Sequence, residues 1–396
     1  MTRLEQLICT LCPQGVEYKS LKELGCFFGG LSGKSKDDFT NGNAKFITYK
    51  NVYSNPALQI DVADKVKISA NEKQHTLQYG DVIFTGSSET PDECGFSSVV
   101  TITTEEKLYL NSFCFFFRFN DSNIILPDFA KHLFRSSNLR RQIIRAASGV
   151  TRFNVSKKLM GDVIIPLPPL EVQREIVRIL NQFTELTAEL TAELTARKKQ
   201  YEYYRDELFR TAKEATVCYL NEISENCDNQ RKPVTSGNRT AGDYPYYGAS
   251  GIVDYVDDYI FDGDYLLISE DGANLLARST PIAFSISGKN WVNNHAHVLR
   301  FDTYETRRYV EIYLNSIDLS PYITGGAQPK LNQKNLNKIP IPLPAPDEQH
   351  RIVSILDRFD TLCNDLASGL PAEIEARQKQ YEYYRDKLLT FKEKTS

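Results

Sequence analysis

An internal repeat constrains the fold of this chain more than any other feature. IPLPPLEVQREIVRILNQFTEL begins at Ile165, and IPLPAPDEQHRIVSILDRFDTL begins at Ile341. The octapeptide KQYEYYRD then occurs unchanged at 199–206 and at 379–386. Such a long identical match does not recur by chance, so the chain consists of two duplicated halves. The second half is slightly longer between these landmarks, within LASGLPAEIEA.

Each repeated segment predicts a long helix that begins after a series of prolines. The prolines favour extended backbone and prevent a preceding helix from continuing. The first helix, from Glu171 to about Phe209, lacks Gly and Pro, and its roughly 40 residues would span ~60 Å. The second is interrupted by Ser368, Gly369 and Pro371. Apolar residues follow a heptad spacing in both, and the expected packing positions are Ile176, Ile179, Phe183, Leu186 and Leu190, then Ile352, Ile355, Phe359, Leu362 and Leu366.

The duplication decides how these apolar stripes are interpreted. One such stripe is typical of an amphipathic helix packed on its own domain. Two matching stripes predict that the helices pack on each other, most simply as an antiparallel pair that separates two domains. The tandem tetrad TAELTAEL at 187–194 is close to one helical turn per unit, so one tetrad more or less would change the spacer by ~6 Å.

Composition indicates a multidomain protein of the reducing cytoplasm. A chain of 396 residues with 41% hydrophobic residues is large enough for more than one core. Its eight cysteines are scattered, which fits a reduced compartment better than a disulfide framework. No signal peptide and no membrane segment are expected. The net charge of −4 means that any nucleic-acid surface must be a local basic patch.

The segments between the helices predict α+β domains. Frequent turn signals and alternating stretches such as LQYGDVIFT and DYLLISEDG indicate short strands of an antiparallel or mixed sheet, with amphipathic helices grouped after them. The predicted organisation is a pseudo-two-fold repeat of two globular domains and two helical spacers. These four parts are 1–164, 165–212, 213–340 and 341–396.

A basic segment precedes each series of prolines. Residues 129–161 contain eight Lys or Arg and no acid, and residues 319–346 contain three Lys and no acid. Each segment includes a Gly loop followed by polar and cationic side chains, SGVTRFNVSKK and GGAQPKLNQK. Such loops suit a phosphate backbone, because small residues permit close approach and cations bind phosphate. A solvated helix face is the alternative for either patch alone.

Four other motifs bear on whether the chain carries out chemistry of its own. GGLSGKS at 29–35 has one residue too few for a P-loop. The Cys9–Cys12 pair has no second pair at zinc spacing, and His295 with His297 lacks a third ligand, so no metal site is predicted. Pro91, Asp92, Glu105 and Lys107 loosely satisfy a nuclease pattern. A nuclease or nuclease-associated DNA binder is therefore the alternative interpretation, and a coiled-coil scaffold is a third.

The motifs together resemble one known family, the specificity subunits of type I restriction-modification systems. The resemblance covers essentially the whole chain. It rests on the two IPLP segments heading helices, the TAEL tetrads, RKKQYEYYRDEL with RQKQYEYYRDKL, and the domain sequences GGLSGKSKDDFTNGNAKFITYKNV, YPYYGASGIVDYVDDYIFDGDYLLISEDGA and KNWVNNHAHVLRF.

The resemblance implies a non-catalytic, cytoplasmic, DNA-binding subunit. Each domain would read one half of a bipartite target on double-stranded DNA, and the helices would set the unread gap and dock two modification (methyltransferase) subunits. Two restriction (translocase and nuclease) subunits would complete the complex. This chain would hold no cofactor, since S-adenosylmethionine, ATP and Mg would belong to the partners, which carry out adenine methylation and restriction.

Candidate DNA contacts are the Gly-loop, basic and polar residues of both domains. Lysines would mainly bind phosphates, while Asn, Arg and Tyr would reach base edges. For the tyrosines, packing inside the domain is the competing interpretation. The candidates are Gly33, Lys34, Lys36, Lys45, Tyr49, Lys50, Arg152 and Lys157 in the first domain, and Arg239, Tyr246, Tyr247, Asn293, Asn294, His295, Lys330 and Lys334 in the second.

Overall fold

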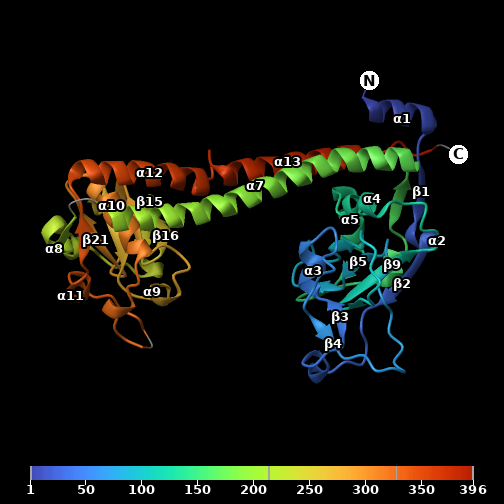
Figure 1. Cartoon of the computed structure of the whole chain (residues 1–396), viewed down its shortest axis with the longest axis horizontal. Helices are drawn as coiled ribbons and strands as arrows, with labels where there is room; N and C mark the ends of the chain where they lie inside the picture. The colour runs from blue at the N-terminus through green and yellow to red at the C-terminus, as the bar shows by residue number, and fades with distance from the viewer. Residues whose placement is uncertain (1, 213–214, 327, 395–396) are drawn as a thin grey trace. The chain divides into compact units, whose positions relative to one another are not determined.

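The computed structural model describes residues 2–212, 215–326 and 328–394, and its chain divides into two units (Figure 1). Unit 1 comprises residues 1–191 and 373–396, and unit 2 comprises residues 192–372. Each unit therefore contains one globular domain together with segments of the predicted helical spacers. No helix among the described residues is long and apolar enough to cross a membrane.

The core of unit 1 is a four-stranded antiparallel sheet in the order β2-β9-β5-β7. Its inner strand β5 (Val82–Thr85) is buried at every residue and lies within the predicted strand segment LQYGDVIFT. Helices α4 and α5 lie between this sheet and helix α7 (Leu170–Thr211) in Figure 1, and all of them contribute to one hydrophobic core. The other bounds are β2 (Gly25–Gly29), β9 (Cys114–Phe119), β7 (Ser97–Val99), α4 (Pro127–Leu133) and α5 (Ser137–Arg145).

Three smaller sheets complete unit 1. They have the orders β4-β3-β8, β10-β11-β6 and β1-β12. The remaining elements are α1 (Arg3–Leu11), β1 (Glu17–Ser20), α2 (Leu21–Leu24), η1 (Lys36–Phe39), β3 (Ala44–Ile47), α3 (Tyr49–Ser54), β4 (Lys65–Val66), β6 (Ser87–Ser88), β8 (Tyr109–Leu110), β10 (Ala147–Ser148), β11 (Phe153–Val155), α6 (Lys157–Met160) and β12 (Ile164–Leu167).

Unit 2 repeats the same sheet topology. Its four-stranded sheet has the order β14-β21-β18-β19. In both sheets the strand that comes first in the chain pairs with the last strand, the last pairs with the second, and the second pairs with the third. This agreement confirms that the sequence repeat is a structural duplication of α+β domains. The bounds are β14 (Glu225–Asn226), β21 (Ala296–Arg300), β18 (Tyr265–Ser269) and β19 (Ala283–Ile286).

A second sheet of unit 2 has the order β16-β15-β20-β17, and helix α10 (Tyr304–Ser316) packs on β18 and β19. The further elements are β13 (Thr216–Cys218), α8 (Leu220–Ile223), η2 (Asp228–Gln230), η3 (Ser236–Asn238), β15 (Ala241–Gly248), β16 (Gly251–Val256), β17 (Phe261–Asp262), α9 (Asn274–Ala277), β20 (Lys289–Val292), η4 (Ser320–Tyr322), α11 (Gln333–Leu336) and β22 (Ile341–Leu343).

The proline segments are short strands, as their sequence predicts. In unit 1, β12 pairs antiparallel with β1, and Pro166 lies opposite Tyr18. In unit 2, β22 pairs antiparallel with β13, and Pro342 lies opposite Val217. A proline cannot donate to a ladder and is tolerated in strands that have a free edge. Both two-stranded sheets provide such an edge immediately before a long helix.

The first predicted helix is α7, Leu170–Thr211, and it is continuous over 42 residues. The second is divided into α12 (Pro346–Asn364) and α13 (Leu370–Leu388). The division falls where Gly369 and Pro371 were expected to interrupt it, because proline has no N–H to continue the helical ladder. The late part of α7 belongs with α12 in unit 2, and its early part belongs with α13 in unit 1.

The helical segments run antiparallel within each unit. In unit 2 the ring of Tyr204 lies 5.9 Å from that of Phe359. Lys198 lies near Cys363, because its ammonium opposes the rise that burial causes in the pKa of the Cys363 thiol. The earlier residue of α7 thus lies beside the later residue of α12, so the two helices are antiparallel. In unit 1 the start of α7 follows β12, which pairs with β1, and the segment after α13 bridges Val16 just before β1. The start of one helix thus lies near the end of the other.

Most of the expected stripe residues are at least half-buried, but the end of the second stripe is exposed. Ile176 and Ile352 are fully buried, and Ile179 and Phe183 pack on the unit 1 core. Leu366 is 77% exposed and Leu362 is 38% exposed. Leu366 lies beyond Asn364, where α12 ends, so the heptad spacing no longer places it on the packed face of a helix.

A buried glutamine fastens each helix to its domain. Gln173 donates to the carbonyls of Ile124 (2.9 Å) and Pro168 (2.8 Å) and accepts from the N–H of Leu126 (2.8 Å). Its counterpart Gln349 donates to Pro344 O at 2.8 Å. Buried polar groups are costly unless they are hydrogen-bonded. The repeated glutamine therefore sets the position of each helix start against the strand before it.

His132 on α4 makes a second polar link inside unit 1. Its Nδ1 lies 2.8 Å from the Tyr381 hydroxyl on α13, and its Nε2 lies 3.1 Å from Asn181 Oδ1 on α7. Burial lowers the pKa of His132 to about 4, so the ring is neutral near pH 7. The neutral ring accepts a hydrogen bond from the Tyr381 hydroxyl and donates one to Asn181 Oδ1. These two hydrogen bonds link the three helices α4, α7 and α13.

This geometry predicts that unit 1 loses stability in acid. Below about pH 6.5 the unfolded chain binds a proton that the folded ring does not bind until about pH 4, so the unfolding free energy falls by about 3 kcal/mol across that window. His132→Gln should reduce this pH dependence in urea titrations of the full chain. His350→Gln, at an exposed ring, is the matched control and should leave it unchanged; an equal effect of both would contradict the assignment.

Candidate nucleic-acid interface

Each predicted Gly loop contains a glycine that has a positive φ and lies close against backbone. In the first-domain hairpin, β10–β11, Gly149 has φ +151°, and an added Cβ would lie 2.1 Å from the carbonyl oxygen of Arg152. In the second-domain hairpin, closed by paired Thr324 and Lys330, Gly325 has φ +85° and its Cβ would lie 2.5 Å from Gln328 O. Gly149 and Gly325 occupy equivalent positions of the sequence repeat, so the turn was duplicated with the domain.

A capped helical turn follows each hairpin. Ser156 accepts from Leu159 N at the start of α6, and Asn332, its equivalent in the repeat, accepts from Asn335 N at the start of α11. The cap holds the chain between the hairpin and the proline strand. Only short connections therefore separate the exposed hairpin tip from the helix.

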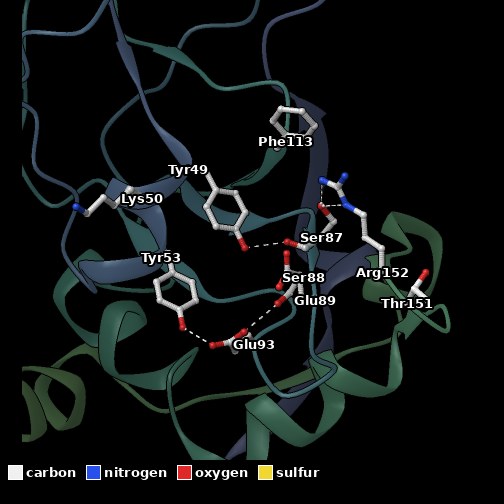
Figure 2. A pocket seen from close by; sticks show the side chains of 10 residues that line it. All are labelled: Tyr49, Lys50, Tyr53, Ser87, Ser88, Glu89, Glu93, Phe113, Thr151 and Arg152. Atoms are coloured by element: carbon white, nitrogen blue, oxygen red, sulfur yellow. Dashed lines mark hydrogen bonds between the residues drawn. The ribbon is translucent and has the colours of Figure 1, made fainter. Parts of the chain in front are cut away.

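The first-domain hairpin borders a hollow of about 640 Å³, which we call the first-domain hollow (Figure 2). Predicted residues Tyr49, Lys50 and Arg152 all line it, so the fold brings together side chains that are far apart in the sequence. Lys50 points away from the other side chains in this view. The full lining is Tyr49, Lys50, Tyr53, Ser87, Ser88, Glu89, Glu93, Phe113, Thr151 and Arg152.

Hydrogen bonds order the walls of the hollow. Tyr49 donates its hydroxyl to Ser87 O at 2.8 Å, and Arg152 Nη2 donates to Ser87 Oγ at 3.0 Å. Tyr53 donates to Glu93 Oε1 at 2.7 Å, and this bond is the main reason that the pKa of Glu93 lies below its usual value. The hollow therefore holds an ionised carboxylate and a guanidinium on separate parts of its wall.

The other first-domain candidates lie outside the hollow, and two are already paired. Lys34 is largely buried and bonds Glu72 at 2.6 Å, which lowers the pKa of that carboxyl to about 2. Lys45 bonds Glu106 at 2.8 Å. These contacts favour structural roles for Lys34 and Lys45. Exposed positions are held by Gly33, Lys36 and Lys157.

Part of the basic segment is internal, which its composition did not reveal. Arg135 donates to the carbonyls of Val52, Tyr53 and Ser97, and Arg140 donates to those of Asp92, Cys94 and Gly95. Burial lowers the pKa of both guanidinium groups to about 10, so they remain charged. Both lie over the ring of Phe96. The segment thus serves the core as well as the surface.

Several second-domain candidates also serve the core. Tyr246 is 1% exposed, and its hydroxyl donates to Val234 O. Asn293 is buried and its Oδ1 accepts from the N–H of His295. Arg239 lies over the Tyr246 ring at 4.3 Å and bonds Asp254 at 3.0 Å. The packing alternative holds for Tyr246, because the side chain is directed inward from β15.

The remaining second-domain candidates are accessible. Asn294, His295, Lys330 and Lys334 are exposed, and Tyr247 is half-buried against Phe284. His295 bonds Asp271 at 2.8 Å, and Lys330 bonds Glu270 at 3.1 Å.

A buried charge cluster supports the second-domain hairpin and was missed in the sequence. His297 lies between Asp228 Oδ2 (2.6 Å) and the carbonyl of Leu331 (2.8 Å), and Arg231 bonds Glu270 at 2.6 Å. Burial would raise the pKa of Asp228, but the bond from His297 holds it below its usual value. No local pattern in the sequence revealed these partners, because Asp228 and Leu331 lie 69 and 34 residues away from His297.

The cluster fits an internal salt-bridge network better than a metal site. The potential ligand atoms of Asp228, Glu270 and His297 lie within 4.8 Å of one another, the only such group of three in the described ranges. Carboxylates therefore do lie beside His297, contrary to the expectation from sequence. However, Arg231 and Lys330 already bind these carboxylates, so the negative charge is compensated within the protein.

Comparison with known proteins identifies the family. The model of the type I restriction modification DNA specificity domain matches residues 13–197 and 213–376, which is most of the chain and one match per half. The chain belongs to this family. The resemblance inferred from the repeated motifs is thereby confirmed, as is the two-domain α+β fold.

Curated relatives of this specificity-domain chain are themselves specificity subunits. The chain is 41% identical over 178 residues to a putative type I specificity subunit of Haemophilus influenzae, and this match covers 44% of the chain and 46% of the relative. It is 38% identical over 251 residues to the EcoR124I/EcoR124II specificity subunit of Escherichia coli, with 57% and 61% covered. The chain thus spans about half to three fifths of these relatives.

Solved structures share the fold over nearly the whole length. An S subunit from Mycoplasma genitalium superposes with a TM-score of 0.53 at 14% identity, covering 95% of this chain and 96% of that one. A chain from a study of complex assembly and conformational transition of the type I system has a TM-score of 0.63 at 19% identity, covering 95% and 98%. At these identities the likeness concerns fold.

The duplicated turn predicts a sharp effect of a single methyl group. Gly149→Ala would place Cβ against backbone at a φ that only glycine tolerates, at a strain of about 1–3 kcal/mol. We expect DNA affinity to fall about tenfold or more while the fold is retained. Gly237→Ala is the matched control, since its Cβ would meet open space. Titration of labelled duplex by anisotropy measures both, and equal affinities would contradict a role of the hairpin.

Proposed function

We propose that the chain is the non-catalytic target-recognition subunit of a type I restriction-modification enzyme. Each domain reads one half of a bipartite DNA target through its hairpin surface. The single observation that carries this proposal is the duplicated Gly hairpin at the same place in two domains of one chain. Two equivalent binding loops on one polypeptide fit a target with two separate half-sites.

The helices serve as the spacer and as the docking region for the modification subunits. Support comes from the uninterrupted α7, which runs from unit 1 into unit 2. The partners supply S-adenosylmethionine-dependent adenine methylation, and restriction subunits supply ATP- and Mg-dependent translocation and cleavage. This chain contributes recognition alone, in the cytoplasm, and binds none of these cofactors itself.

Methylome sequencing tests the bipartite reading and the spacer together. The chain expressed with its modification subunit should methylate adenines in a motif of two short words around a fixed gap. One TAEL inserted after Leu194 adds ~6 Å of helix at an exposed part of α7. It should lengthen the gap and preserve both words. A changed word, or a continuous motif in the parent complex, would refute the spacer role.

Matched exposed tyrosines support docking of two copies of one partner. In unit 2, Tyr203 is 65% exposed and lies edge-on to Tyr204 at 5.5 Å; in unit 1, Tyr383 is 62% exposed and lies edge-on to Tyr384 at 5.3 Å. In each unit the second tyrosine of the pair, Tyr204 or Tyr384, contacts the equivalent phenylalanine, Phe359 or Phe183. Exposed aromatic side chains held rigidly are typical anchors of protein interfaces.

Native mass spectrometry tests this docking role. Tyr203→Ala and Tyr383→Ala should each reduce the complex from two modification subunits to one, at a cost of about 2 kcal/mol or more per contact. The double variant should lose both. Tyr79→Ala, a 51% exposed tyrosine outside the helices, is the control and should retain two. Two bound subunits in the double variant would show that the helices dock their partners elsewhere.

A further inference from the structure

Arg152 is a preorganised cation in the first-domain hollow that has no acidic partner among the described residues. Its Nε and Nη2 donate to Ser87 Oγ at 3.3 and 3.0 Å, and its guanidinium lies 5.5 Å from the Phe113 ring centre. The serine oxygen and the aromatic ring hold the side chain in place without neutralising its positive charge. The third nitrogen, Nη1, takes part in neither of these two hydrogen bonds to Ser87. In contrast, Lys34 and Lys45 are tied to carboxylates.

The charges around Arg152 disfavour a phosphate as its ligand. Glu93 lines the same hollow and is kept ionised by the hydroxyls of Tyr53, Thr90 and Ser88. Glu89 also lines it. A phosphate placed here would meet two carboxylates, whereas a neutral group with hydrogen-bond acceptors would meet only the favourable guanidinium. The edge of a nucleobase is such a group.

The shape and lining also suit a base. The hollow of about 640 Å³ has three aromatic side chains in its lining, those of Tyr49, Tyr53 and Phe113. The hairpin tip beside it carries Val150, which is 92% exposed and stands next to Thr151 and Arg152. An exposed apolar tip next to a fixed arginine matches the two kinds of group that read base edges in a major groove.

We propose that Arg152 reads a guanine in the half-site of the first domain, an inference that rests on the proposed function. An arginine held in a plane donates two hydrogen bonds to guanine O6 and N7, a pattern that no other base offers. The equivalent turn position in the second domain is Gln328, which is exposed. Glutamine pairs with adenine N6 and N7. The same turn therefore presents a different reader in each domain.

Arg152→Gln provides the test, because it places the second-domain side chain in the first-domain hairpin. The assembled complex would select duplexes from a library randomised over the first half-site, with the second half-site intact. We expect parent protein to require guanine at one position and the variant to lose that preference about tenfold or more, with adenine enriched. Lys73→Gln, at an exposed cation outside the hollow that is not among the candidate contacts, is the matched control and should retain the parent motif.

The outcomes separate this inference from the proposed function. If the parent selects a bipartite motif and Arg152→Gln selects the same motif with uniformly weaker, less salt-dependent binding, Arg152 binds phosphate and the inference is overturned. A parent motif without guanine in the first half-site overturns it as well. If the parent selects no motif at all, the proposed function fails first.

Discussion

The packing of helical segments into each domain core is the interaction on which the rest of the structure depends. In unit 1, Val172, Ile176 and Leu180 of α7 are completely buried in the core that also holds α4 and the sheet. In unit 2, Ile352, Val353 and Leu356 of α12 do the same. Each such side chain contributes about 1.5–3 kcal/mol, and a buried glutamine fixes the register. The recognition domains and the helices therefore fold as one body within each unit.

This coupling explains how a hairpin at the surface of a domain keeps a fixed place. In both halves the chain passes directly from the Gly hairpin through a capped turn and a proline strand to the helix. Each step is stabilised by a cap or a strand pair, and by Gln173 or Gln349. The duplicated architecture thus carries two equivalent hairpins, but their side chains and supports differ. Arg152 lies in the first-domain hollow, whereas Lys330 bonds Glu270 of a buried charge cluster.

The sequence predicted the features that are set by backbone chemistry. Prolines and glycines predicted the extended backbone before each helix, the loop at Gly149 and the interruption near Gly369, because their conformational preferences act locally. The absence of Gly and Pro between Glu171 and about Phe209 predicted the extent of α7 to within a few residues, and apolar periodicity predicted its packed face. It failed for Leu366, since a helix break overrides the heptad.

Side-chain partners across the fold could not be predicted in the same way. Lys34 and Arg140 are residue types that usually lie at the surface. However, Lys34 bonds Glu72, which is 38 residues away in the sequence. Arg140 bonds backbone carbonyls that are 45 to 48 residues away. Tyr246 was a candidate for base contact, but it is buried. The sequence did not reveal this, because strand alternation does not indicate which face of the strand is inside. Arg152 was named from its Gly loop, but the hollow around it depends on Phe113 and Glu93, which no local pattern connects to it.

Hydroxyl-radical footprinting of the full complex on its methylated target tests the central claim most directly. Two equivalent hairpins on one chain predict two protected segments separated by unprotected base pairs. A change in the first-domain hairpin should erase one segment only. A single continuous footprint, or simultaneous loss of both segments, would contradict independent reading by two domains.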